Sequence, residues 1–127
     1  MELSEETIEL LVACRRGDST MVEKLLKDKH ADPTTGDNYA IKISAQTGHY
    51  KVVELLLEDG RADPAADNNY AIKSSAQNGK LEVVKLLLEN GRVDPTDDNY
   101  AIRWSAQNGH LEVVNIIISV AMQKIKV

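Results

Sequence analysis

The feature that most constrains the fold of this chain is an internal repeat of about 31 residues. The motif Asn-Tyr-Ala-Ile begins at Asn38, Asn69 and Asn99. An Asp-Pro pair precedes each copy, and the three pairs are 31 residues apart. Repeats of this length are typical of solenoids, because each unit can bury its apolar face only by stacking on its neighbours. We therefore expect an elongated stack of similar units.

The repeat accounts for the whole chain, 1–127, as a single repeat domain. A weaker copy occupies the N-terminus, where Gly17 and Val22 stand 31 residues before Gly48 and Val53. The predicted units are an N-terminal capping repeat over 1–33, a second repeat over 34–64, a third over 65–95, and a C-terminal repeat with an extended last helix over 96–127.

Each unit is expected to contain two helices and a connector. In the third unit, Asn69 is suited to cap a first helix that ends before Gly79. A second helix is expected over 81–88, where the apolar positions cover roughly 200° of the helix circumference, more than one neighbour can bury. Asp94 and Pro95 then favour a turn. The predicted fold class is an all-α repeat solenoid of four stacked helix pairs with short inter-repeat loops.

Two segments of the repeat resemble the ankyrin repeat family. Residues 105–114, with the sequence SAQNGHLEVV, are similar to the family's Ala-Ala-x-x-Gly-His-x-x-Val-Val segment. Residues 86–91 are similar to its Leu-Leu-Leu-x-x-Gly. The resemblance implies an ankyrin-like fold and a non-catalytic module that binds a protein partner.

The chain also departs from the family pattern. The family's Thr-Pro-Leu-His is replaced by Tyr-Ala-Ile followed by Lys or Arg, beginning at Tyr39, Tyr70 and Tyr100. We interpret these tyrosines as structural substitutes for the missing threonine, with a role in partner binding as the alternative. The repeat is also shorter than the family's 33 residues, and the difference falls in the connector. We therefore expect a tight loop with little or no strand instead of a β-hairpin.

The resemblance leaves the source of the chain open. Short repeats of the Asn-Tyr-Ala-Ile type are similar to those of large ankyrin families in giant DNA viruses. An engineered chain and a fragment of a longer ankyrin array are the alternatives.

Composition disfavours several classes of partner. The formal net charge is −5, which disfavours nucleic acids and anionic membrane surfaces because both recruit clustered Lys and Arg. No segment approaches the ~20 apolar residues of a membrane span, and the acidic N-terminus lacks the pattern of a secretory signal. Cys14 is the only cysteine, which favours a reducing compartment. We expect a cytoplasmic protein, with the nucleus as the alternative.

The sequence offers no residues for catalysis, for a metal or for a cofactor. The three histidines His30, His49 and His110 have no spacing that would gather metal ligands. His49 and His110 are expected to have structural roles at the turn between the two helices of a unit. Cys14 aligns with an alanine of the next unit, Ala45, so we interpret it as a small core residue. The enzyme class is therefore disfavoured.

Partner-binding residues are expected where the copies differ. Trp104 points about 200° away from Ile102 on an ideal helix and aligns with Ile43 and Ser74, so we predict that it anchors a partner. Packing on Tyr100 is the alternative. In ankyrin-like proteins this first-helix face and the loop tips line a concave binding surface. The resemblance assigns to that face Ile43, Gln46, Thr47, Ser74, Gln77, Asn78, Trp104, Gln107 and Asn108. The loop-tip candidates are Asp37, Asp67, Asp97 and Asp98.

The two ends of the chain differ in polarity. Lys24 stands where the later units have a leucine or isoleucine, which suits a polar N-terminal cap. The last unit has no such change, and its predicted second helix is longer. Its uncovered apolar arc is formed by Val114, Ile118, Ala121 and Ile125. We predict that this arc either makes contacts between chains, giving a homo-oligomer, or is covered by further units of a longer array. A tail that bends to cover itself is the alternative.

Overall fold

The computed structural model describes residues 2–125, and over these residues it is helical, without a β-strand. The helices are α1 (Glu5–Arg16), α2 (Ser19–Leu26), α3 (Thr35–Thr47), α4 (Tyr50–Asp59), α5 (Ala66–Gln77), α6 (Leu81–Asn90), η1 (Asp97–Asn99), α7 (Tyr100–Gln107) and α8 (Leu111–Ile125). The tight connectors without strand pairing confirm the expectation for the loops within the described residues.

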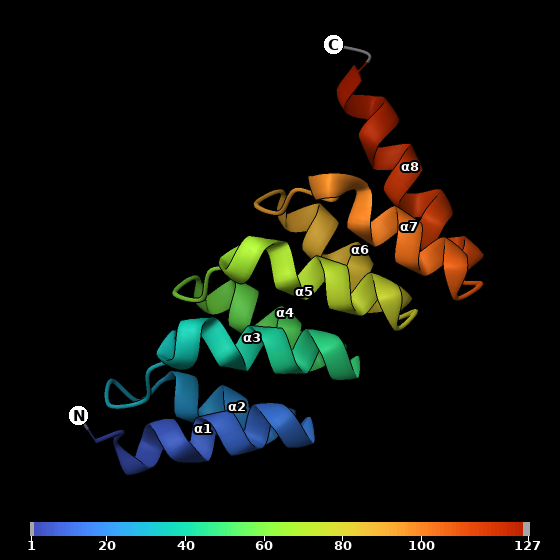
Figure 1. Ribbon diagram of the computed structural model, residues 1–127. Coiled ribbons are helices and arrows are strands. Elements are labelled where there is room, and N and C mark those ends of the chain that lie inside the picture. The colour runs from blue at the N-terminus through green and yellow to red at the C-terminus, as the bar shows by residue number, and fades with distance from the viewer. Residues whose placement is uncertain (1, 126–127) are drawn as a thin grey trace.

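The helices form two stacked layers, as Figure 1 shows. Helices α1, α3, α5 and α7 contact one another in sequence and make the first-helix layer, while α2, α4, α6 and α8 make the second-helix layer. Each first helix also packs on the second helix of its own unit. The predicted all-α solenoid of four helix pairs is therefore confirmed.

A continuous apolar core runs between the layers through all four units. Leu56, Leu87 and Ile117, at equivalent positions of α4, α6 and α8, are fully buried. Equivalent serines are also buried in the first helices, where Ser44 donates a hydrogen bond to the Ala40 carbonyl four residues earlier, 2.8 Å away. The wide apolar arc of the second helices is explained by this packing, because each helix is covered on more than one side.

The first helices of the middle units begin in a turn of left-handed backbone. Residues 67–69 have φ between 55° and 62°, a conformation that Asn and Asp tolerate better than other non-glycine residues. The predicted capping role of Asn69 is therefore wrong. Its Oδ1 atom instead accepts a hydrogen bond from the Asp94 N–H at 2.9 Å, and Asn38 accepts one from the Asp63 N–H at 2.8 Å. These asparagines fasten the connector that follows each unit to the start of that unit's first helix.

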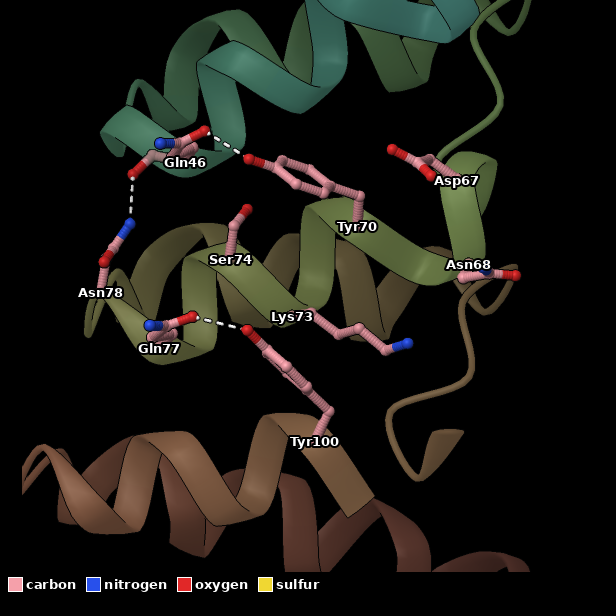
Figure 2. A pocket seen from close by; sticks show the side chains of 9 residues that line it. All are labelled: Gln46, Asp67, Asn68, Tyr70, Lys73, Ser74, Gln77, Asn78 and Tyr100. Atoms are coloured by element: carbon pink, nitrogen blue, oxygen red, sulfur yellow. Dashed lines mark hydrogen bonds between the residues drawn. The ribbon is translucent and has the colours of Figure 1, made fainter. Parts of the chain in front are cut away.

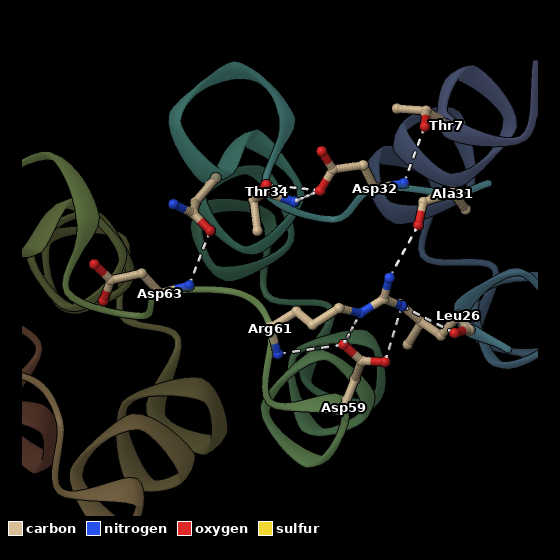
Figure 3. A network of polar contacts seen from close by, with 9 residues as sticks. Thr7, Leu26, Ala31, Asp32, Thr34, Asp59, Arg61 and Asp63 are labelled. Atoms are coloured by element: carbon tan, nitrogen blue, oxygen red, sulfur yellow. Dashed lines mark hydrogen bonds and ion pairs between the residues drawn. The ribbon is translucent and has the colours of Figure 1, made fainter. Parts of the chain in front are cut away.

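Arg61 ties the second unit to the first (Figure 3). Its guanidinium group donates to the Leu26 carbonyl at 2.9 Å and to the Ala31 carbonyl at 3.2 Å. Arg61 Nε also donates to the Asp59 Oδ1 atom at 2.9 Å, and this hydrogen bond raises the pKa of Arg61. Arg61 therefore satisfies backbone carbonyls at the end of α2 and beyond it.

The rings of His49 and His110 each pack against the helix–helix turn of the preceding unit. The His49 Nε2 atom lies 3.1 Å from the Arg15 carbonyl oxygen, and the ring covers Gly17. Gly17 has φ of 77°, and a Cβ atom there would lie 2.5 Å from His49 Nδ1. His110 covers Gly79 in the same way. These contacts agree with the structural interpretation of both histidines.

The two ends of the stack differ less in the polarity of their exposed residues than the sequence indicates. Lys24 is exposed, as expected of a polar cap, but Ile8, Val12 and Met21 are exposed at the same end. The prediction of a polar N-terminal cap is therefore right for only one position. At the other end α8 continues to Ile125, and its last turns project beyond the stack (Figure 1).

Candidate partner-binding site

Polar side chains cross two junctions between first helices, from α3 to α5 and from α5 to α7, at equivalent positions. The Tyr70 hydroxyl donates to Gln46 Oε1 of the preceding unit at 2.9 Å, and the Tyr100 hydroxyl donates to Gln77 Oε1 at 2.9 Å. The Asn78 amide nitrogen donates to the Gln46 carbonyl at 3.3 Å. Figure 2 shows these bonds on one side of the first-helix layer. They support the structural interpretation of Tyr70 and Tyr100.

Ion pairs link the same units near the loop tips. Lys42 Nζ lies 3.3 Å from an Asp67 carboxylate oxygen, and Lys73 Nζ lies 2.9 Å from Asp97. Hydrogen bonds from Lys73 and from Asn69 lower the pKa of Asp97, because they stabilise the ionised carboxylate. The charges at the predicted loop-tip positions Asp67 and Asp97 are therefore paired within the chain.

A hollow of about 350 Å³ lies over α5, between its neighbours α3 and α7 (Figure 2). Five predicted binding residues line it: Gln46, Asp67, Ser74, Gln77 and Asn78. Four further lining residues were not predicted: Asn68, Tyr70, Lys73 and Tyr100. The constant Tyr and the Lys or Arg of each copy are the sequence signal for Tyr70, Lys73 and Tyr100.

Besides the paired charges of Asp67 and Lys73, the hollow presents neutral hydrogen-bonding groups. Gln46 and Gln77 each accept from a tyrosine through Oε1, and their Nε2 atoms have no hydrogen-bond partner among residues 2–125. Asn78 donates through Nδ2, which leaves its Oδ1 atom without a donor from the described residues. Such groups are suited to peptide groups and polar side chains of another molecule.

Four other predicted residues lie outside this hollow. Ile43 packs against the core, and the Thr47 hydroxyl donates to the Ile43 carbonyl at 2.7 Å, so both contribute to their own helix. Asn108 donates to the Gln77 carbonyl at 2.9 Å, while Gln107 is exposed on α7. The first-helix face is therefore divided between packing and exposed positions.

Trp104 lies on the same layer and is half-buried. Its ring centroid is 6.0 Å from that of Tyr100, and the two ring planes are inclined by 46°. Packing on Tyr100, the alternative to an anchor role, is therefore present. Because Trp104 keeps part of its surface exposed, this contact leaves the anchor prediction open.

The remaining loop-tip candidates are exposed. The Asp37 carboxylate is 3.9 Å from Lys42 Nζ, a weaker contact than the one that Lys42 makes with Asp67. Asp98 is exposed and has a left-handed backbone, with φ of 52°. Both residues remain predictions for partner binding.

The chemistry of Cys14 is that of a core residue. Its side chain is fully buried, and burial raises the pKa of the thiol to about 12. No group of three potential metal-ligating side chains is found among the described residues. No helix within residues 2–125 is both long enough and apolar enough to cross a membrane.

The family model for ankyrin repeats (three copies) matches residues 10–99 and, in a second overlapping match, residues 61–126. The chain belongs to the ankyrin repeat family. The resemblance noted from the sequence is thereby confirmed. Ankyrin repeats are generally protein–protein interaction modules and are typically non-catalytic. Comparison with curated proteins gives no match.

Proposed function

We propose that this ankyrin-repeat chain is a non-catalytic module that binds a protein partner on its first-helix layer. The observation that carries the proposal is the hollow over α5, where Gln46, Gln77 and Asn78 each keep one amide atom without a hydrogen-bond partner among residues 2–125. In ankyrin-like proteins the corresponding face is the concave binding surface. Trp104, on the neighbouring helix α7, adds an aromatic surface beside these polar groups.

The partner segment that fits this surface is polar and largely uncharged. Lys42 and Lys73 are already paired with Asp67 and Asp97, so little unpaired positive charge remains near the hollow to attract phosphates. The net charge of −5 also opposes nucleic acids. Peptide groups and amide side chains could use both the donors and the acceptors of the hollow. An apolar residue of the partner would then cover Trp104.

The test begins with a partner captured from the native host and then purified. Its affinity for the chain is measured by isothermal titration calorimetry. Trp104→Ala should weaken binding by about 2 kcal/mol, or about thirtyfold, because truncation removes a large aromatic anchor. Tyr50→Ala is the matched control, because Tyr50 is an exposed aromatic residue on α4 in the other layer. It should leave the affinity unchanged.

A second variant tests the hollow itself. Ser74 lines the hollow, and its hydroxyl donates only to the Ala71 carbonyl of its own helix, at 3.4 Å. Ser74→Arg should fill the hollow and abolish binding while the circular dichroism spectrum stays unchanged. If Trp104→Ala and Ser74→Arg both bind like the parent, the proposed surface is wrong. If Trp104→Ala melts well below the parent, Trp104 is a packing residue.

A further inference from the structure

The C-terminal end of the stack exposes positions that every other unit buries. Cys14, Ala45 and Ala76 are equivalent residues of α1, α3 and α5, and all three are fully buried. The equivalent residue of α7, Ala106, is exposed. This position therefore faces the following unit. We call the residues that share this direction the C-terminal face: Ile102, Ala106, Val114 and Ile118.

The N-terminal end of the stack exposes positions that, in the later units, pack against the preceding unit. Ala40, Ala71 and Ala101 are buried, with exposed fractions of 0% or 1%, whereas the equivalent residue of α1, Glu9, is exposed. This position therefore faces the preceding unit. The apolar residues Ile8, Val12 and Met21 surround Glu9 and are 37–48% exposed. We call these residues the N-terminal face: Ile8, Glu9, Val12 and Met21.

The two faces are the two halves of one interface. At each junction inside the chain, one unit contributes the residues at the C-terminal-face positions. The next unit packs against them with its residues at the N-terminal-face positions. We propose that the C-terminal face of one copy of this chain packs against the N-terminal face of a second copy, so that copies stack head to tail. The occupant of each face is thus a second copy, bound by a continuation of the intrachain interface.

The charges at the two ends favour this arrangement. Lys42 pairs with Asp67 and Lys73 with Asp97 across successive junctions. Arg103 is the next residue of this series; it is exposed and has no acidic partner among residues 2–125. A following unit would supply an acidic residue to pair with Arg103. Glu5, near the start of the chain, occupies that position in the first unit.

The hydrogen bonds fix the alignment of Glu5. Thr7 Oγ1 accepts from the Asp32 N–H at 2.9 Å, as Asn69 accepts from the Asp94 N–H in the third unit. Thr7 is therefore equivalent to Asn69, and Glu5 is equivalent to Asp67, two residues before it. Arg103 of one copy and Glu5 of the next would continue the series of ion pairs.

Glu9 acts against the same contact. It stands where the internal junctions have a buried alanine, so head-to-tail stacking would bring its carboxylate against the apolar C-terminal face. Burying a carboxylate without a partner opposes association. Stacking should therefore be weak in the natural sequence, and removal of this one carboxylate should strengthen it.

Such an interface joins different faces of the two copies, so it leaves a free face at each end and forms an open series, not a closed dimer. The first-helix layers of successive copies would then form one continuous surface. A partner with repeated binding segments could use several copies at once.

Sedimentation velocity of the 127-residue chain over a range of concentrations tests the proposal. We expect a concentration-dependent series of species in place of a single dimer. Glu9→Ala should lower the dissociation constant by about tenfold, and Ile118→Lys should abolish association. Glu58→Ala is the matched control for Glu9→Ala, because Glu58 is an exposed glutamate on α4 outside both faces. It should have no effect.

Charge reversal distinguishes head-to-tail stacking from other contacts. Arg103→Glu and Glu5→Lys should each weaken association, and an equimolar mixture of the two variants should restore it. Both residues are exposed, so folding should survive, as circular dichroism can verify. If Glu5→Lys has no effect while Ile118→Lys abolishes association, two C-terminal faces pair with each other and the proposal is wrong. A chain that stays monomeric both as the wild type and as Glu9→Ala would also overturn it. Trp104→Ala should leave association unchanged, which separates this test from that of partner binding.

Discussion

The Tyr100 hydroxyl donates a hydrogen bond to Gln77 Oε1 at 2.9 Å, and this bond joins the fourth unit to the third. Tyr70 and Gln46 make the same contact one unit earlier, at the same distance. The tyrosine therefore satisfies a polar group of its neighbour, and not one of its own helix. Each junction between the later units is linked in this way on the side of the proposed binding surface.

Tyr100→Phe should lower the free energy of unfolding by about 1 kcal/mol, the usual net contribution of one hydrogen bond. Urea denaturation measures this change. Tyr39→Phe is the control, because the Tyr39 hydroxyl has no hydrogen bond within the described residues. If the two variants lose equal stability, the Tyr100–Gln77 bond makes no specific contribution.

Leu87→Ala should cost about 2–5 kcal/mol, because Leu87 is fully buried where α6 packs between its neighbours. Unfolding should remain a single cooperative transition in chemical denaturation, since neighbouring units stabilise each other. Leu111 is 67% exposed at the start of α8, so Leu111→Ala should change stability by no more than about 0.5 kcal/mol. Similar losses for the two variants would contradict the interface packing described for Leu87.

The Cys14 thiol should react with Ellman's reagent only as fast as the protein opens. Burial hides the sulfur and raises its pKa to about 12, so the folded protein has little reactive thiolate at neutral pH. In denaturant the thiol should react at the rate of an ordinary cysteine. Cys14→Ala should remain folded, because Ala45 occupies the equivalent buried position in the second unit. Rapid labelling of the native chain would show that Cys14 is more accessible than its burial indicates.

The Lys73–Asp97 ion pair should stabilise the fold at neutral pH and lose this contribution in acid. The pKa of Asp97 is lowered from its ordinary value of 3.8 by hydrogen bonds from Lys73 and Asn69. The unfolded chain therefore binds a proton at this position more readily than the folded chain does. As the pH falls below 3.8 through the lowered folded value, the stabilisation disappears. Asp97→Asn should melt below the wild type at pH 7, and the difference should shrink at about pH 3. Asp98→Asn, at the exposed neighbouring position, should melt like the wild type at both pH values.

The repeat was enough to predict the architecture, because the period, the glycine stops and the apolar arcs are local features that recur in each copy. The same reasoning failed for Asn69. A good helix-capping residue before a first helix is normally assigned to that helix, but its side chain bonds to the Asp94 N–H, 25 residues later. Lys73 and Tyr100 also line the hollow, and a residue that is constant between copies gives no local sign that it borders a surface hollow as well as packing within the stack.

The sequence alone determined the number of helix pairs, their apolar faces and the family, because each depends on spacing along the chain. The tertiary structure alone decided which partner each polar side chain has and how far each position at the ends of the stack is covered. Ala76 and Ala106 have the same residue type and the same place in their helices, yet the first is buried and the second is exposed. The physical reason is that burial in a repeat stack depends on the unit beyond the junction, and a local pattern carries no information about that unit.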